Sequence, residues 1–257
     1  MRKLLSADTF RLFHSKWFWL CLGGMLTMSV AFIIMQYTAM DYEVPLSRVI
    51  FLPMSFYGAA LAAFISLFVG EDFSDGFIRN KIIAGHSRYS IFASNLIISW
   101  IACVVVYLIV IFFTVTIGSF FFEINITLNS FCKYLSLGIG MCIAYGCIYC
   151  SITMLCGSKT TATVLSMGLA FFFLCVSLHT NQVMVQPEYK DGVLNPAYVD
   201  GFAKSVYAVL HDLNPTGQAA QLSAMNVFHP VQWFICNLFW VFATVLGMLC
   251  FKHKNIQ

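Results

Sequence analysis

Six stretches of the sequence contain no Asp, Glu, Lys or Arg, and each is long enough to cross a lipid bilayer. They cover residues 17–40, 49–70, 89–122, 134–158, 160–187 and 213–251. A helix needs about 20 predominantly apolar residues to span the ~30 Å hydrocarbon core of a membrane. The pattern predicts an all-α integral membrane protein with six spans, at about 17–37, 49–70, within 89–118, 133–156, 161–179 and 231–251.

Composition excludes a soluble fold and a separate catalytic domain. Charged residues make up 10% of the chain and hydrophobic residues 60%, whereas soluble domains carry about 25% charged residues. The spans use nearly all of the length, so residues 1–257 are predicted to form a single transmembrane domain. The first span is predicted to be retained, because it has full spanning length and no small-residue cleavage pattern follows it.

The positions of Lys and Arg predict the orientation. With six spans and a cytoplasmic N-terminus, ten of the 14 basic residues lie inside and four outside, which is the positive-inside asymmetry. We therefore expect a multi-pass protein of the cell membrane with both termini in the cytoplasm. The net charge of +3 follows from this asymmetry, and no basic patch with base-reading side chains indicates a nucleic-acid partner. The four outer basic residues are Arg48, Lys133, Lys190 and Lys204.

The segment before the first span, residues 2–16, is basic and amphipathic. Leu5 and Leu12 share a face at helical spacing, with Asp8 and Arg11 on other faces. Such a segment predicts a helix lying in the headgroup plane. A solvated basic start that only satisfies the charge asymmetry is the alternative.

The longest segment between spans is an outer one, residues 181–229. Within it, apolar side chains repeat at helical spacing over 202–213, and Asn214-Pro215 ends that helix. A second short helix is expected through 219–227. Both helices are predicted to rest on the outer membrane surface or to dip into it.

The ten cysteines lie in or beside apolar stretches and predict packing, with neither a metal site nor disulfides. Cys147 and Cys150 have the spacing of a metal or redox motif, but no His or second Cys pair completes it. In a spanning helix a cysteine behaves as a small apolar residue. Small residues along 133–156, such as Gly138, Gly140 and Gly146, predict close helix packing in the same way.

A dense charged island, residues 71–88, separates the second span from the third. Gly76 and Gly85 bracket a segment whose apolar side chains, Phe77, Ile78, Ile82 and Ile83, form one face of a short helix. Asp75 and Arg79 are spaced for an i, i+4 pair, and Glu71 and Asp72 precede them. A small helix of this kind is suited to a groove on a cytoplasmic protein. An ordinary solvated loop is the alternative.

The island resembles the signature loop of ABC-2 type exporter permeases, in both its position and its pattern. The pattern is Glu71-x4-Gly76-x2-Arg79-x5-Gly85-x-Ser87-Arg88, and the order of the other segments is similar to that family over essentially the full chain. The resemblance implies that residues 71–88 form a coupling helix that docks onto an ATP-binding cassette ATPase subunit, and that residues 2–16 form an elbow helix. The implied partner-binding residues are Glu71, Asp72, Asp75, Gly76, Arg79, Gly85, Ser87 and Arg88.

The same resemblance implies an assembly of two permeases, identical or homologous, with two ATPase subunits in a bacterial plasma membrane. Spans 1 and 5 would form the interface between the permeases. The chain has no Gly-x4-Gly-Lys-Ser/Thr pattern, so ATP and magnesium are expected on the partner and no cofactor on this chain.

Two other functions remain as alternatives to an exporter permease. An intramembrane enzyme needs convergent polar groups at membrane depth, and the uncharged stretches offer no Asp or Glu, with His179 at the end of a span and expected to be interfacial. An ATP-independent channel or a membrane-anchoring partner subunit is the other alternative, although no charged ring indicates a pore. The apolar, aromatic-rich spans favour a hydrophobic or amphipathic cargo: an antimicrobial peptide, a drug or a lipid-like molecule.

Overall fold

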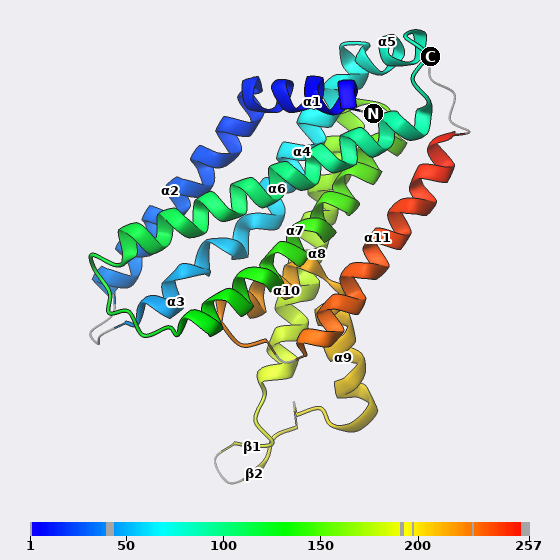
Figure 1. Ribbon diagram of the computed structural model, residues 1–257. Coiled ribbons are helices and arrows are strands. Elements are labelled where there is room, and N and C mark those ends of the chain that lie inside the picture. The colour runs from blue at the N-terminus through cyan, green and yellow to red at the C-terminus, as the bar shows by residue number, and fades with distance from the viewer. Residues whose placement is uncertain (1, 40–43, 191–192, 197, 228, 253–257) are drawn as a thin grey trace.

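The computed structural model describes residues 2–39, 44–190, 193–196, 198–227 and 229–252, and the fold is a bundle of six long helices (Figure 1). Each of the six is long and apolar enough to cross a membrane, which is the architecture of a multi-pass membrane protein. They are α2 (Lys16–Ala39), the broken helix formed by α3 (Leu46–Ile50), η1 (Leu52–Phe56) and α4 (Tyr57–Ser74), then α6 (Arg88–Gly118), α7 (Leu128–Cys156), α8 (Lys159–Val185) and α11 (Pro230–Lys252). Each of the six predicted spans lies within one of these long helices.

Local sequence explains where these helices begin and change. Ser87, Thr127 and Ser158 cap α6, α7 and α8, each hydroxyl accepting a hydrogen bond from the backbone N–H three residues later. The second span begins at Leu46, earlier than expected, and tightens to a 3-10 helix around Pro53 before α4 continues it. Proline lacks a backbone N–H, so the regular α-helical ladder is interrupted there.

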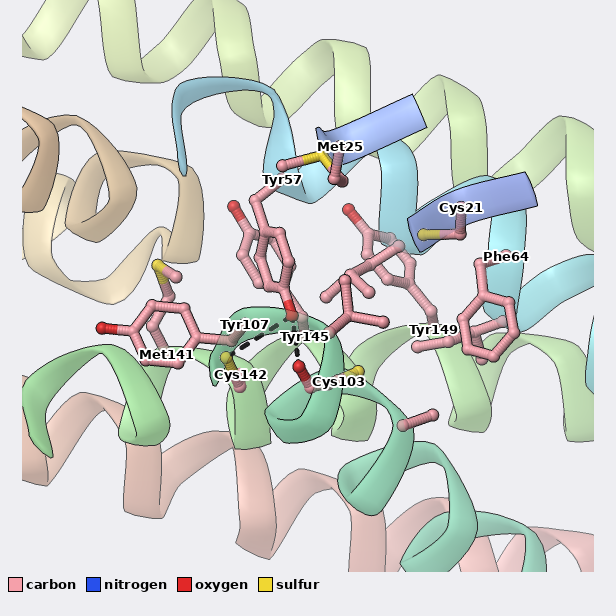
Figure 2. Packing of buried hydrophobic residues seen from close by; sticks show 14 of the residues in the cluster. Cys21, Met25, Tyr57, Phe64, Cys103, Tyr107, Met141, Cys142, Tyr145 and Tyr149 are labelled. Carbon is pink, nitrogen blue, oxygen red and sulfur yellow. Dashed lines mark hydrogen bonds between the residues drawn. The ribbon is translucent and has the colours of Figure 1, made fainter. Parts of the chain in front are cut away.

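The core lies where α4, α6 and α7 meet. Figure 2 shows Tyr57, Tyr107, Tyr145 and Tyr149 packed there with buried cysteines, and the Tyr57 hydroxyl donates to the backbone carbonyl of Cys103. Gly138 permits this packing, since a Cβ there would lie 2.1 Å from the Tyr107 hydroxyl oxygen. All ten cysteines are free thiols, seven of them in the core or partly buried. Within the described residues no group of three or more His, Cys, Asp or Glu is placed to hold a metal ion.

Two short helices lie at one end of the bundle, together with the last turn of α11 (Figure 1). They are α1 (Arg2–His14), which runs across the ends of the long helices, and α5 (Phe77–Ile83), which joins α4 to α6. The predicted helix at 2–16 is therefore present, but its faces differ from the expectation. Asp8 points inward with Leu4 and Leu12 and is 2% exposed, because it pairs there with the Lys81 ammonium group.

The opposite end carries the connection between α8 and α11. It contains a small antiparallel pair, β1 (Tyr189–Lys190) with β2 (Val193–Leu194), then α9 (Gly201–Leu213) and α10 (Pro215–Ser223). The helix expected at 202–213 is confirmed. The second helix starts at Pro215 instead of 219 and ends at Ser223, because Asn214 caps it and proline is favourable in a first turn.

α9 and α10 form a helical hairpin that inserts between the long helices. α10 packs against α8, α7 and η1 and is almost wholly buried. The Asn214 side chain at the hairpin tip donates to the Phe173 carbonyl of α8 at 2.7 Å. Residues 173 to 185 of α8 correspond to about 18 Å of helix, so the tip lies deep in the bundle. α10 therefore lies inside the protein, packed among the long helices.

Candidate functional site

α5 is a short helix with a turn of left-handed glycine backbone at each side. Gly76 has φ of 71° before its first residue and Gly85 has φ of 85° after its last turn. The Gly85 and His86 amides return to the Ile82 and Lys81 carbonyls, which is the usual way to close a helix at a glycine. The chain therefore turns sharply at one glycine on each side of α5. As a result, α5 projects as a separate element between α4 and α6.

A cluster of buried charges fixes α5 to α1 and α4. Lys81 Nζ on α5 lies 2.9 Å from Asp8 Oδ1 on α1 and 3.3 Å from Asp72 Oδ2 on α4. Arg11 on α1 pairs with the Asp72 carboxylate, and Ser94 on α6 donates to Asp8 Oδ2 at 2.6 Å. These five side chains, which we call the charge cluster, join α1 to the consecutive helices α4, α5 and α6.

Burial governs the electrostatics of the charge cluster. It lowers the pKa of Arg11, against the raising effect of the nearby carboxylates, Asp8 first among them. Burial also lowers the pKa of Lys81, whereas the charge of Asp8 and its hydrogen bond to Lys81 raise that pKa. The carboxylates therefore stabilise the charged form of each cation against the effect of burial. Two carboxylates balance two cations, so removal of Asp72 would leave Arg11 without an ion-pair partner within the charge cluster, and removal of Lys81 would leave Asp8 without one.

A second polar contact joins the start of α2 to the start of α8. Glu71 Oε1 on α4 accepts a hydrogen bond from the Trp17 indole at 2.5 Å and lies 3.2 Å from Lys159 Nζ. Lys159 Nζ also lies 5.0 Å from the centre of the Trp17 ring. Gly70 allows α8 to begin this close to α4, since a Cβ there would meet the Lys159 backbone at 3.0 Å.

The outward side of α5 combines apolar and basic groups. Ile78 is buried and Ile82 packs against the core, whereas Phe77 is 43% and Ile83 77% exposed. Arg79 and Asn80 are exposed beside them. The four apolar residues expected to share one face are thus divided between two faces. We call Phe77, Arg79, Asn80 and Ile83 the outward face of α5.

The structure separates the eight residues expected to bind a partner into three groups. Asp72 is fully buried and Glu71 is half-buried, and both make contacts within the chain. Gly76 and Gly85 shape the corners, Ser87 caps α6, and the Arg88 guanidinium donates to the Lys252 carbonyl at 3.2 Å. Asp75 and Arg79 remain as exposed charged side chains.

The expected pairing of Asp75 with Arg79 is absent from the ion pairs of the described residues. The physical reason is the backbone between them. Asp75 ends α4 and Gly76 turns the chain in the left-handed region, so Asp75 and Arg79 do not belong to one helix. Asp75 instead accepts a hydrogen bond from the Ser74 hydroxyl at 3.1 Å.

Sequence reasoning missed four members of the charge cluster: Asp8, Arg11, Lys81 and Ser94. Asp8 and Arg11 are expected on faces of the first helix other than its apolar one, and the only available signal was an acidic residue within an otherwise basic helix. Asp8 pairs with Lys81, 73 positions away in the chain, and Arg11 pairs with Asp72, 61 positions away. Pairing over that separation depends on how the helices pack.

A polar group around the α9–α10 hairpin was also missed. His211 Nδ1 lies 2.7 Å from the Thr180 hydroxyl, and the Gln221 amide donates to Asp212 Oδ1 at 2.5 Å. Both His211 and Asp212 are 1% exposed. The turn between the two helices is tight, since a Cβ on Gly217 would lie 2.1 Å from the His211 carbonyl oxygen. Three amides in an uncharged stretch, Asn214, Gln218 and Gln221, were the signal available in the sequence.

Comparison with known proteins adds no identification: no family model matches the chain, and no curated protein matches it. The class that the fold itself defines is a multi-pass helical membrane protein. Its two polar assemblies are the charge cluster with α5 at one end and the inserted hairpin at the other.

Proposed function

We propose that this chain is the permease subunit of an ATP-driven exporter of the ABC-2 type. The observation that carries the proposal is α5, a short helix between two spans. The charge cluster holds the inner side of α5 against the bundle. Its outward face consists of Phe77, Arg79, Asn80 and Ile83. An exposed face with two large apolar side chains and a cation fits a groove on a partner protein. α5 then serves as the coupling helix and α1 as the elbow helix.

In this proposal the partner is a separate ATP-binding cassette subunit that carries ATP and magnesium. Movement of the partner displaces α5, and the charge cluster transmits that displacement to α1, α4 and α6, which it joins directly. The buried charges resist separation because each ion would otherwise lose its partner in a dry environment. The helices therefore move with α5 as a unit. Such a unit is what switching between two states of a transporter requires.

The orientation and the assembly are parts of the same proposal. The α1 and α5 end lies in the cytoplasm of a bacterial plasma membrane, with both termini inside. A second permease, identical or homologous, packs against α2 and α8, whose surfaces carry many exposed apolar side chains. The cargo is hydrophobic or amphipathic, for example an antimicrobial peptide, a drug or a lipid-like molecule, because the outer surfaces of the spans are apolar.

The test is co-purification of the tagged chain from its native membrane in mild detergent. We expect an ATP-binding cassette protein in stoichiometric amount. The double variant Arg79→Glu/Ile83→Asp alters only exposed side chains of α5, so it should insert normally and lose the ATPase. Lys133→Glu is the matched control, because Lys133 is an exposed cation on α7 at the opposite end of the bundle.

Retention of the ATPase by the α5 variant would show that α5 is not the docking element. Recovery of the wild-type chain alone would contradict the exporter proposal and favour an ATP-independent channel. Recovery with a different stoichiometric protein would favour an anchoring subunit instead.

A further inference from the structure

A groove runs between α2 and α4 on the surface of the bundle. Its volume is about 310 Å³, at the lower end of the usual range for ligand pockets. The Cys21 thiol lies 3.8 Å from the Ala60 carbonyl, and Figure 2 shows Cys21 near Phe64, where the two helices meet. The groove walls are almost wholly apolar and contain several small residues: Gly24, Ala59, Ala60 and Ala63.

The length of the groove matches one leaflet of a bilayer. Its lining on α2 extends from Trp17 to Met28, and on the end of η1 and α4 from Phe56 to Leu67. Eleven residue steps along a helix correspond to about 16 Å, and half of a ~30 Å hydrocarbon core is about 15 Å. The groove therefore begins at the α1 and α5 end of the bundle and stops near the middle of the membrane.

The mouth of the groove is positively charged. Trp17 lines it, and the ammonium groups of Lys16 and Lys159 each lie 5.0 Å from the centre of the Trp17 ring. Glu71 neutralises Lys159 at 3.2 Å. Lys16 is exposed and belongs to none of the ion pairs formed by the described residues. One unpaired cation thus stands where the apolar groove meets the headgroup layer.

We propose that this groove binds one acyl chain of an anionic phospholipid, taken from the leaflet at the α1 and α5 end, with its phosphate at Lys16. The apolar groove is as long as one leaflet and accommodates the acyl chain, and the Lys16 ammonium group attracts the charged headgroup. The groove offers no polar wall for a water-soluble ligand. This inference goes beyond the proposed function and does not require an ATPase partner, but it requires that a second permease packed against α2 and α8 leaves the groove uncovered.

The test uses the full chain in nanodiscs of phosphatidylcholine with a small fraction of phosphatidylglycerol that carries a photoreactive diazirine in one acyl chain. Cross-linked peptides are mapped by mass spectrometry. We expect cross-links concentrated on residues 20–28 and 56–67. Gly24→Leu should reduce them by about tenfold, equivalent to about 1.4 kcal/mol of binding free energy, because the new side chain occupies the groove.

Gly23→Leu is the matched control. A Cβ at either Gly23 or Gly24 meets no atom within 4 Å, and both residues are exposed on α2, but only Gly24 lines the groove. Leucine also favours a helix over glycine, so both variants should fold. Gly23→Leu should therefore label as the wild type does.

The headgroup is tested by Lys16→Gln, with Lys133→Gln as the control at the opposite end. We expect Lys16→Gln to lower labelling by the phosphatidylglycerol probe about fivefold, as for the loss of one basic residue at an anionic surface. Labelling by a phosphatidylcholine probe with the same tail should not change.

Three results would overturn the proposal. The first is equal labelling of Gly24→Leu and the wild type. The second is labelling that spreads evenly over the exposed faces of α8 and α11. The third is an intermolecular cross-link between two chains through Ala59→Cys that abolishes lipid labelling, because the groove would then be covered by a second copy.

Discussion

Asp72 illustrates how burial changes the role of a single charged residue. In the sequence it lies in a polar island and is expected to face a partner protein, but its side chain is fully buried between Arg11 and Lys81. A carboxylate is tolerated there because two cations and the Asp8 carboxylate complete a balanced group. The position of Asp72 in the chain indicated a polar environment, but its partners, Arg11 and Lys81, come from two other helices, α1 and α5.

We expect Asp72→Ala to destabilise the protein by about 3 kcal/mol, the typical cost of leaving a buried ion without its partner. Unfolding in detergent, followed by denaturant titration, measures the change. Asp75→Ala is the control, because Asp75 is exposed and its side chain accepts a hydrogen bond from Ser74 without joining the charge cluster, and its effect should be within about 0.5 kcal/mol.

The double variant Arg11→Met/Asp72→Leu separates charge from shape. It removes one cation and one anion together and leaves Asp8 paired with Lys81, so it should recover most of the stability lost in Asp72→Ala. A double variant as unstable as Asp72→Ala would show that the cluster acts through packing instead of charge balance.

At the scale of elements, α9 exposes apolar side chains and buries polar ones, which is the reverse of an amphipathic helix in a soluble protein. Its apolar residues Phe202, Val206 and Val209 are exposed, with Phe202 at 86%, while His211 and Asp212 are buried against other helices. A lipid environment explains this, because apolar side chains are stable there and buried polar groups find partners within the bundle. The amphipathic pattern predicted the helix, and its orientation depends on the surrounding solvent.

The inserted α9–α10 hairpin is held by Asn214, and its loss should loosen α10 selectively. Asn214→Ala removes both the cap of α10, where Asn214 Oδ1 accepts from the Thr216 amide at 3.0 Å, and the bond to the Phe173 carbonyl. We expect a loss of about 2 kcal/mol, from the cap and one buried hydrogen bond. Hydrogen exchange should quicken at the amides of 216–223.

Ser158→Ala is the matched control for this variant. Ser158 caps α8 with the same kind of bond, 3.2 Å from its oxygen to the Thr161 amide, but it is exposed. Its replacement should cost about 1 kcal/mol and leave exchange in α10 unchanged. Equal exchange in the two variants would mean that Asn214 does not anchor the hairpin.

At the scale of the whole molecule, the two ends of the bundle should lie on opposite sides of the membrane. The native thiol of Cys132 is exposed on the first turns of α7, at the α9 and α10 end. We expect a membrane-impermeant maleimide to label it in intact cells. In a Cys132→Ser background, His86→Cys, next to α5, should be labelled only after the cells are permeabilised.

Labelling of His86→Cys in intact cells would place the α1 and α5 end outside and contradict the cytoplasmic orientation. The expectation rests on the excess of Lys and Arg at that end. Docking of a cytoplasmic ATPase onto α5 requires the same orientation, so this experiment also bears on the proposed function.

Local sequence alone specifies the spans, the existence of α1, α5 and α9, and the two glycines that bracket α5. These features depend on local properties: length, apolar periodicity, capping residues and the backbone freedom of Gly76 and Gly85. Residues near one another in the chain are enough to specify them, and they were predicted correctly for that reason.

Only the tertiary structure decided which polar residues are buried and what they contact. The charge cluster joins Asp8, Asp72 and Lys81 across several helices, and the hairpin tip at Asn214 reaches Phe173 of α8. These pairings depend on how the helices cross and on which face of each one is turned inward, as the groove between α2 and α4 also does. Helical periodicity defines the faces of a helix, but its packing against neighbours selects the buried one.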